Sequence, residues 1–334
     1  MTAHEGSDHA ERAERRDIGE ATLEQLRADL VRLSHYYMTG DPLPLFLEMR
    51  RVRSRVYTAL DRQLWPRDQT ELYFQLAALN CLMAVAANDL GYQQAGEELV
   101  RAGWAYATAI GHRPLLAHLR LELAGIVFWD RPRQSLELAQ SGLEYLSDGP
   151  NAAQLHLQSA RAAARLGDAE TARRAITSAT EAREREHHDD LLEIGGEFRL
   201  SRASHHYMAG AAVIEIPDAQ ADAVTELGRA AELYAAGPEP GEDHGFGMTA
   251  LTHIDLAAAL LRADRLDSAA SVLAPVLSLP HGKRIKNLPE RLTRVRAELA
   301  SPRYQSSPRA RDLDEQIEEF TRDTIVAGLR ELPG

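Results

Sequence analysis

Apolar side chains recur at intervals of three and four residues along nearly the whole chain from residue 18 onward. In the segment 72–90 this spacing is carried by Leu72, Leu76, Leu79, Met83, Ala86 and Leu90. Such spacing places the apolar positions on one face of an α-helix. The segments 115–128 and 251–261 are richer still, which predicts helices buried between others. No segment alternates polar and apolar residues for long enough to predict a sheet, so we expect an all-α fold.

Short polar breaks separate the predicted helices. They contain Gly, Asp or Pro and lie at residue 91 and at 111–114, 130–132, 148–150, 167–168 and 264–265. Glycine adopts the left-handed backbone angles found at a helix C-terminus, and Asp caps the helix that follows. Helices joined by such tight turns pack as antiparallel neighbours. Longer irregular stretches are expected at 237–247, 279–288 and 301–308.

The segment 166–176 (LGDAETARRAI) has the features of a repeat. A Gly-Asp turn is followed by Ala172, Ile176 and Ala179, whose spacing resembles the turn and second helix of a tetratricopeptide repeat. Similar frames follow the turns at 91, 130 and 264. We therefore predict a right-handed α-solenoid of roughly six or seven tetratricopeptide-like helical hairpins. An irregular helical bundle is the alternative.

The chain divides into three parts by composition. Residues 1–16 are polar and highly charged, which predicts a disordered lead-in. The helical array is expected over 17–300 and a C-terminal capping helix within 301–334.

The net charge of −12 comes from 50 acidic and 38 basic residues and argues against broad nucleic-acid binding. Lys283 and Lys286 are the only lysines, and this preference for Arg together with abundant Ala is typical of a GC-rich, actinobacterial genome. A single cysteine, Cys81, excludes an internal disulfide. The first twenty residues lack an apolar signal segment, and no uninterrupted apolar run is long enough to span a bilayer. A cytoplasmic protein without membrane contact is expected.

Five short segments resemble one family of regulators. They are 15–18 (RRDI), 34–37 (SHYY), 166–168 (LGD), 253–257 (HIDLA) and 312–317 (DLDEQI). From Arg15 to about residue 322 the chain resembles the C-terminal sensor region of actinobacterial helix-turn-helix regulators of the XRE type. The resemblance implies a repeat array that senses a ligand or partner in transcriptional control. Too few residues precede the resembling stretch for a helix-turn-helix domain, so direct nucleic-acid binding is not expected without an added domain.

Motifs typical of enzymes are missing from the sequence. It has no His-Glu-x-x-His, no Gly-x-Ser-x-Gly, no phosphate-binding loop and no dinucleotide-binding glycine pattern. The adjacent pairs at 187–188 and 205–206 are both His-His, and neighbouring helical residues point about a quarter-turn apart, which is unsuited to sharing one metal ion. We expect a protein that is not an enzyme and that uses no cofactor and no metal.

The concave face of a helical array is the expected recognition surface. Alignment of the hairpins on their turns places a row of Asn, Arg and His side chains there. The predicted ligand-binding residues are Asn80, Asn88, Arg120, Arg161, Arg202 and His206. Asn can hold the backbone amides of an extended peptide, and Arg can hold carboxylates with two parallel bonds. The alternative is that these side chains form only internal ion pairs and hydrogen bonds.

Two charged segments have open interpretations. The acidic loop 237–247 is either a lid over the groove or a plain connector. The basic segment 283–303 either docks on an acidic partner or forms the charged outer face of a capping helix.

We predict recognition of a peptide or protein partner in the concave groove, within a bacterial regulatory pathway. The alternative function is a scaffold or dimerisation module, with a homodimer formed through the C-terminal helix. Its apolar stripe consists of Leu313, Ile317, Phe320, Thr324 and Ala327.

Overall fold

The computed structural model describes residues 18–322, and within that range all regular structure is helical, with 15 α-helices and no strands. In chain order the α-helices are α2 (Glu20–Thr39), α3 (Pro42–Leu60), α4 (Pro66–Asp89), α5 (Gln93–Ala109), α6 (Arg113–Val127), α7 (Pro132–Gly142), α8 (Gly149–Arg165), α9 (Ala169–Glu184), α10 (Asp190–Ile194), α11 (Arg202–Val213), α12 (Gln220–Ala236), α13 (Phe246–Arg262), α14 (Leu266–Leu277), α15 (Asn287–Leu299) and α16 (Pro308–Arg322). Two 3-10 turns, η1 (Gly196–Phe198) and η2 (His281–Lys283), complete the list. The all-α prediction is confirmed; the proposed lead-in at 1–16 lies outside the described residues.

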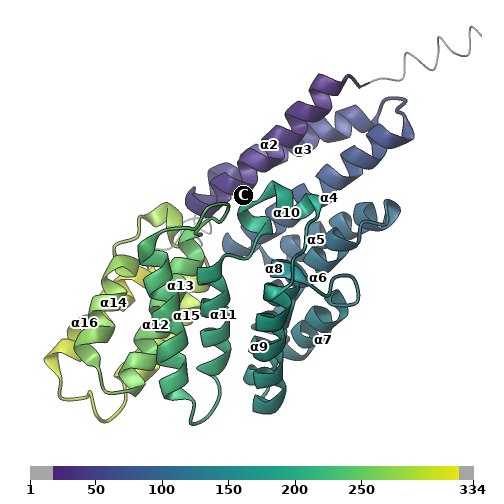
Figure 1. Ribbon diagram of the computed structural model, residues 1–334. Coiled ribbons are helices and arrows are strands. Elements are labelled where there is room, and N and C mark those ends of the chain that lie inside the picture. The colour runs from purple at the N-terminus through teal and green to yellow at the C-terminus, as the bar shows by residue number, and fades with distance from the viewer. Residues whose placement is uncertain (1–17, 323–334) are drawn as a thin grey trace, which may run out of the picture.

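The helices pack in pairs that follow one another along the chain (Figure 1). The pairs are α2/α3, α4/α5, α6/α7, α8/α9, α11/α12, α13/α14 and α15/α16. The first helix of each pair also contacts the first helix of the next pair. The short segment α10–η1 lies between the pairs, after α9 and before α11, and η2 lies between α14 and α15.

Several turns between consecutive helices share one hydrogen bond, in which a backbone N–H bonds to the carbonyl five residues earlier. It joins Tyr92 to Ala87 (2.8 Å), His112 to Ala107 (3.0 Å), Asp168 to Ala163 (2.9 Å) and Arg265 to Leu260 (2.9 Å). This bond needs a residue with left-handed backbone angles just after the helix. Gly91 and Gly167 supply it with φ of 88° and 82°, and Asp264 adopts a φ of 58° without being glycine. The predicted helix-ending turns are therefore confirmed at these positions.

Helix α4 is the most deeply embedded element of the first half of the chain. It is the one described helix long and apolar enough to cross a membrane, yet 78% of its most apolar window is buried inside the molecule. Leu72, Leu76 and Leu82 on this helix are completely buried. Its composition therefore reflects a core position between neighbouring helices.

Two segments that are distant in sequence close over the inner side of the array. The first is α10–η1, which packs against α2 (Figure 1). There the Ser34 hydroxyl donates to the Gly195 carbonyl at 2.8 Å and accepts from the Glu197 N–H at 3.0 Å. The second is the start of α15, where the Lys286 N–H donates to the Asp89 carbonyl at 2.9 Å. The two halves of the chain are thus joined by direct hydrogen bonds.

The C-terminal helix α16 packs against α14 and α15. Leu313, Ile317 and Phe320 are at most 3% exposed and belong to the core of the second half. The predicted mating stripe is therefore already covered by the chain itself over its described part. Thr324 and Ala327 lie outside the described residues.

Candidate functional site

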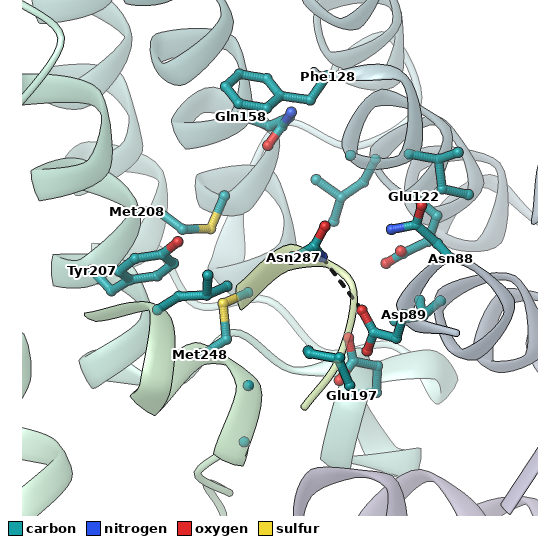
Figure 2. Close-up of a pocket in the computed structure, with 18 of the residues that line it drawn as sticks. Asn88, Asp89, Glu122, Phe128, Gln158, Glu197, Tyr207, Met208, Met248 and Asn287 are labelled. Atoms are coloured by element: carbon teal, nitrogen blue, oxygen red, sulfur yellow. Dashed lines mark hydrogen bonds between the residues drawn. The ribbon is translucent and has the colours of Figure 1, made fainter. Parts of the chain in front are cut away.

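A cavity of about 180 Å³ lies on the inner side of the array (Figure 2). Its walls come from α2, α4, α6, α8, α11, α13 and α15, which are the first helices of the successive pairs. Within residues 18–322 no second helix of a pair contributes to the lining. The segment η1 and the residues that precede α13 and α15 close the remaining sides.

Three carboxylates form one wall of the cavity, and each comes from a different element. Asp89 ends α4, Glu122 lies in α6 and Glu197 lies in η1. Figure 2 shows them on the same side of the cavity. The Tyr37 hydroxyl donates to Asp89 Oδ2 at 2.6 Å, and Asn287 Nδ2 lies 3.4 Å from Asp89 Oδ1.

These carboxylates share a poorly solvated environment. Burial raises the pKa of Asp89 to about 7. The hydrogen bond from Tyr37 opposes this rise in pKa, and repulsion from Glu122 adds to it. Burial also raises the pKa of Glu197 well above its ordinary value, with repulsion from Glu122 and Asp89 adding to the effect. In the described part of the chain no Lys or Arg forms an ion pair with any of the three; Glu122 Oε1 lies 3.2 Å from the buried His118 Nε2. Asp89 and Glu197 therefore hold their protons more tightly than ordinary carboxyl groups do, and no Lys or Arg among the described residues balances the wall when it ionises.

None of these three carboxylates is among the residues predicted from the sequence. Asp89 and Glu122 interrupt two of the most apolar helical segments, which is a signal for a buried polar position. Glu197 lies in an irregular segment without periodicity, so no local pattern could have identified it.

The opposite wall is mainly apolar, although Arg291 Nη2 donates to the Tyr207 hydroxyl at 3.4 Å. Tyr207 and Met208 of α11 and Met248 of α13 lie across the cavity from the carboxylates in Figure 2. Methionine side chains are flexible and polarisable, and they adapt to the shape of a bound group. The cavity therefore offers an acidic end and an apolar end.

Two arginines complete the lining, and both are engaged with neighbouring side chains. Arg161 Nη1 donates to Gln158 Oε1 at 3.0 Å, and its guanidinium lies 4.5 Å from the Phe128 ring centre. Arg291 is 2% exposed, and its Nη1 lies 3.4 Å from Asp255 Oδ2. Arg291 is therefore held by a buried ion pair with Asp255.

The basic segment 283–303 is not a free cationic surface. Besides Arg291, Arg294 pairs with Glu215, and Arg296 Nε lies 2.7 Å from Asp314 Oδ1. The sequence predicted either a docking site for an acidic partner or a charged outer face. Arg291 fits neither, because it lies on the apolar face of α15 beside Leu288 and Leu292. Its position within that stripe was the signal for burial.

Two of the six predicted ligand-binding residues, Asn88 and Arg161, line the cavity. Asn80 does not reach it: the side chain is fully buried, and Gly103 of α5 packs against it. Arg120 is also directed elsewhere, with its guanidinium 4.1 Å from the centre of the Trp104 ring.

Arg202 and His206 form ion pairs away from the cavity. Arg202 Nη1 lies 3.1 Å from Glu239 Oε1, and His206 Nδ1 lies 2.8 Å from Glu226 Oε2. Tyr207 and Met208 of the same helix line the cavity, whereas Arg202 and His206 do not. The structure therefore does not bring these two residues together with Asn88 and Arg161.

The loop between α12 and α13 is held in place by ion pairs. Glu242 Oε1 lies 2.9 Å from Arg183 Nη2, and Asp243 Oδ2 lies 3.0 Å from His35 Nδ1 on α2. Gly245 and Phe246, which follow directly, line the cavity. This arrangement favours the lid interpretation over that of a plain connector.

Comparison with known proteins leaves the geometry as the basis for any functional conclusion. No protein-family model matches the chain, and a search of curated proteins finds no significant match.

Proposed function

We propose that the chain is a non-enzymatic, tetratricopeptide-like regulatory protein that binds a peptide or protein partner on its concave face. One observation carries the proposal: the cavity is lined by the first helix of every pair and by none of the described second helices. In a right-handed solenoid of helical hairpins, the first helices line the concave groove. The shared turn geometry and the pairing of successive helices support the same architecture.

The size of the cavity limits what enters it. Cavities of about 150 Å³ hold a molecule the size of benzene. A cavity of about 180 Å³ therefore accommodates a side chain or a chain terminus of a partner, with the rest outside. We place this recognition in cytoplasmic transcriptional control, on the strength of the resemblance to XRE-type sensor regions. The scaffold alternative has less support, because Leu313, Ile317 and Phe320 are covered by the chain itself.

A cavity-blocking variant tests the proposal. Gly125 of α6 lines the cavity, and an added Cβ would meet nothing within 4 Å. Gly125→Leu should therefore fill the space without disturbing the helix. Gly228→Leu is the matched control, because its Cβ also meets nothing within 4 Å and it lies on α12, outside the lining.

The probe is a library of fluorescently labelled peptides of defined length, measured by anisotropy. We expect at least one peptide to bind the unmodified protein. Gly125→Leu should weaken the affinity for that peptide by at least about tenfold, and Gly228→Leu should leave the affinity unchanged. Equal binding by Gly125→Leu would show that the cavity is not the site. Failure of the whole library would remove the peptide-binding function.

A further inference from the structure

We propose that the bound group is an organic cation with an apolar body, whose ammonium end lies against Asp89, Glu122 and Glu197. Its apolar part then lies against Tyr207, Met208 and Met248. This inference rests on the proposed function, because it takes the cavity as the binding site.

The carboxyl groups of the acidic wall have no basic partner. Three elements bring them to one side of the cavity, as Figure 2 shows. Among residues 18–322, neither Lys nor Arg neutralises them, and the Glu197 carboxylate forms no hydrogen bond or ion pair. Like charges in a poorly solvated site raise one another's free energy, and a bound cation offsets that repulsion.

The charges of the lining favour a cation over an anion as the ligand. Arg291 is balanced by Asp255, whereas Arg161 donates to the neutral amide of Gln158 and packs on the Phe128 ring. Among the described residues, the lining therefore has one positive charge without a carboxylate partner and three carboxyl groups without a Lys or Arg partner. An anionic ligand would also have to approach the acidic wall, at a cost in repulsion.

The residues around the cavity suit an organic cation better than a metal ion. In the part of the chain that the structure describes, no group of three or more His, Cys, Asp or Glu side chains is arranged to hold a metal. Across the cavity lie the ring of Tyr207, whose hydroxyl accepts from Arg291, and the thioethers of Met208 and Met248. An apolar wall of this kind favours a carbon body, and aromatic faces also attract ammonium groups.

An ammonium group on an apolar body can come from a peptide or from a free small amine. The peptide probe is Leu-Leu amide, which has a free α-ammonium, compared with acetyl-Leu-Leu amide. The small-molecule probe is n-hexylammonium, compared with 1-hexanol. Titration calorimetry of the full chain at pH 7.5 measures all four.

We expect at least one ammonium probe to bind at least about tenfold more tightly than its neutral counterpart. If only Leu-Leu amide does so, the source is a peptide N-terminus; if only n-hexylammonium does so, it is a small amine. Binding should also release protons, because a cation lowers the raised pKa values of Asp89 and Glu197. Proton release appears as a difference between heats measured in phosphate and in Tris.

Glu197→Gln removes one charge and keeps the side-chain shape. It should weaken ammonium binding by at least about tenfold. Glu193→Gln on α10 is the matched control, because that carboxylate is 74% exposed, lies outside the lining and should leave binding unchanged. A melting temperature at least as high as that of the unmodified protein shows that Glu197→Gln is folded.

The outcomes separate the two proposals. If neutral probes bind as tightly as ammonium probes and Gly125→Leu abolishes both, the cation inference is wrong and the cavity remains the binding site. If neither ammonium probe binds, or if Glu197→Gln binds them with unchanged affinity, the cation inference is also wrong. The peptide library then tests separately whether the cavity is a binding site. If Gly125→Leu leaves ammonium binding intact, both the inference and the proposed site are wrong.

Discussion

Asp89 connects three parts of the chain through one side chain. Its carboxylate accepts a hydrogen bond from Tyr37 of α2, and its other oxygen lies near Asn287 of α15. The residue itself ends α4 and is 8% exposed. Its protonation therefore affects both the charge of the cavity and the contact between the two ends of the array.

The raised pKa of Asp89 predicts a pH-dependent stability. The carboxyl has a pKa of about 7 in the folded protein and 3.8 as its ordinary value, so the folded state holds its proton more tightly. The free energy of unfolding should therefore fall as the pH rises from about 4 to about 7, by up to about 1.4 kcal/mol per pH unit. Urea unfolding at successive pH values measures this slope.

Asp89→Asn should flatten that slope, because the amide does not titrate. Part of the slope should remain in this variant, because the pKa of Glu197 is also raised. Glu193→Gln, at an exposed carboxylate, should retain the slope of the unmodified protein. An unchanged slope in Asp89→Asn would contradict the raised pKa.

At the scale of elements, α10–η1 is the segment that departs from the repeating order. Its apolar residues, Leu191, Ile194 and Phe198, belong to the core of the first half, although they follow α9 in sequence. The close approach to α2 depends on Gly196, whose φ is 60° and whose Cβ would lie 2.5 Å from the Ser34 carbonyl carbon. A side chain has no room there, because the obstacle is backbone.

Gly196→Ala should detach η1 from α2 and open one side of the cavity. The matched control is Gly167→Ala, which has a φ of 82° but no atom within 4 Å of the added Cβ. The control should lose only about 1–2 kcal/mol from its left-handed conformation. Gly196→Ala should lose more and should show faster amide hydrogen exchange at residues 190–198. Equal losses in the two variants would refute the steric explanation.

At the scale of the whole molecule, α16 closes the C-terminal end of the core. Leu313 is 3% exposed, so Leu313→Asp would bury an unpaired charge and should destabilise the protein by about 3–5 kcal/mol. Gln316→Asp, at an exposed position of the same helix, should change stability by less than about 0.5 kcal/mol. Thermal unfolding measures both.

Light scattering of the same variants distinguishes a capping helix from a mating surface. If α16 serves only as a cap, the molecular mass of folded Leu313→Asp should equal that of the unmodified protein. A dimer that dissociates to a monomer in Leu313→Asp, without loss of thermal stability, would instead support the scaffold function.

Much of the helical framework could be predicted because its causes are local. The three-and-four spacing within α4 and the turns at Gly91 and Gly167 involve residues within a few positions of one another. Asn88 and Arg161 could be placed on the inner side because they lie close to those turns on first helices. The same alignment also predicted Arg202 and His206 for that row, but neither lines the cavity, whereas Tyr207 and Met208 of the same helix do.

The succession of paired helices follows from the chain alone, because helix periodicity and turn chemistry act over a few residues. Which charges meet in the cavity depends on contacts between distant segments. Asp89 lies near Asn287, 198 positions away, and Glu197 reaches the site by packing against Ser34, 163 positions away. Such contacts depend on how the helices stack and where one segment is inserted. Local spacing does not contain that information, so the acidic wall emerged only from the folded chain.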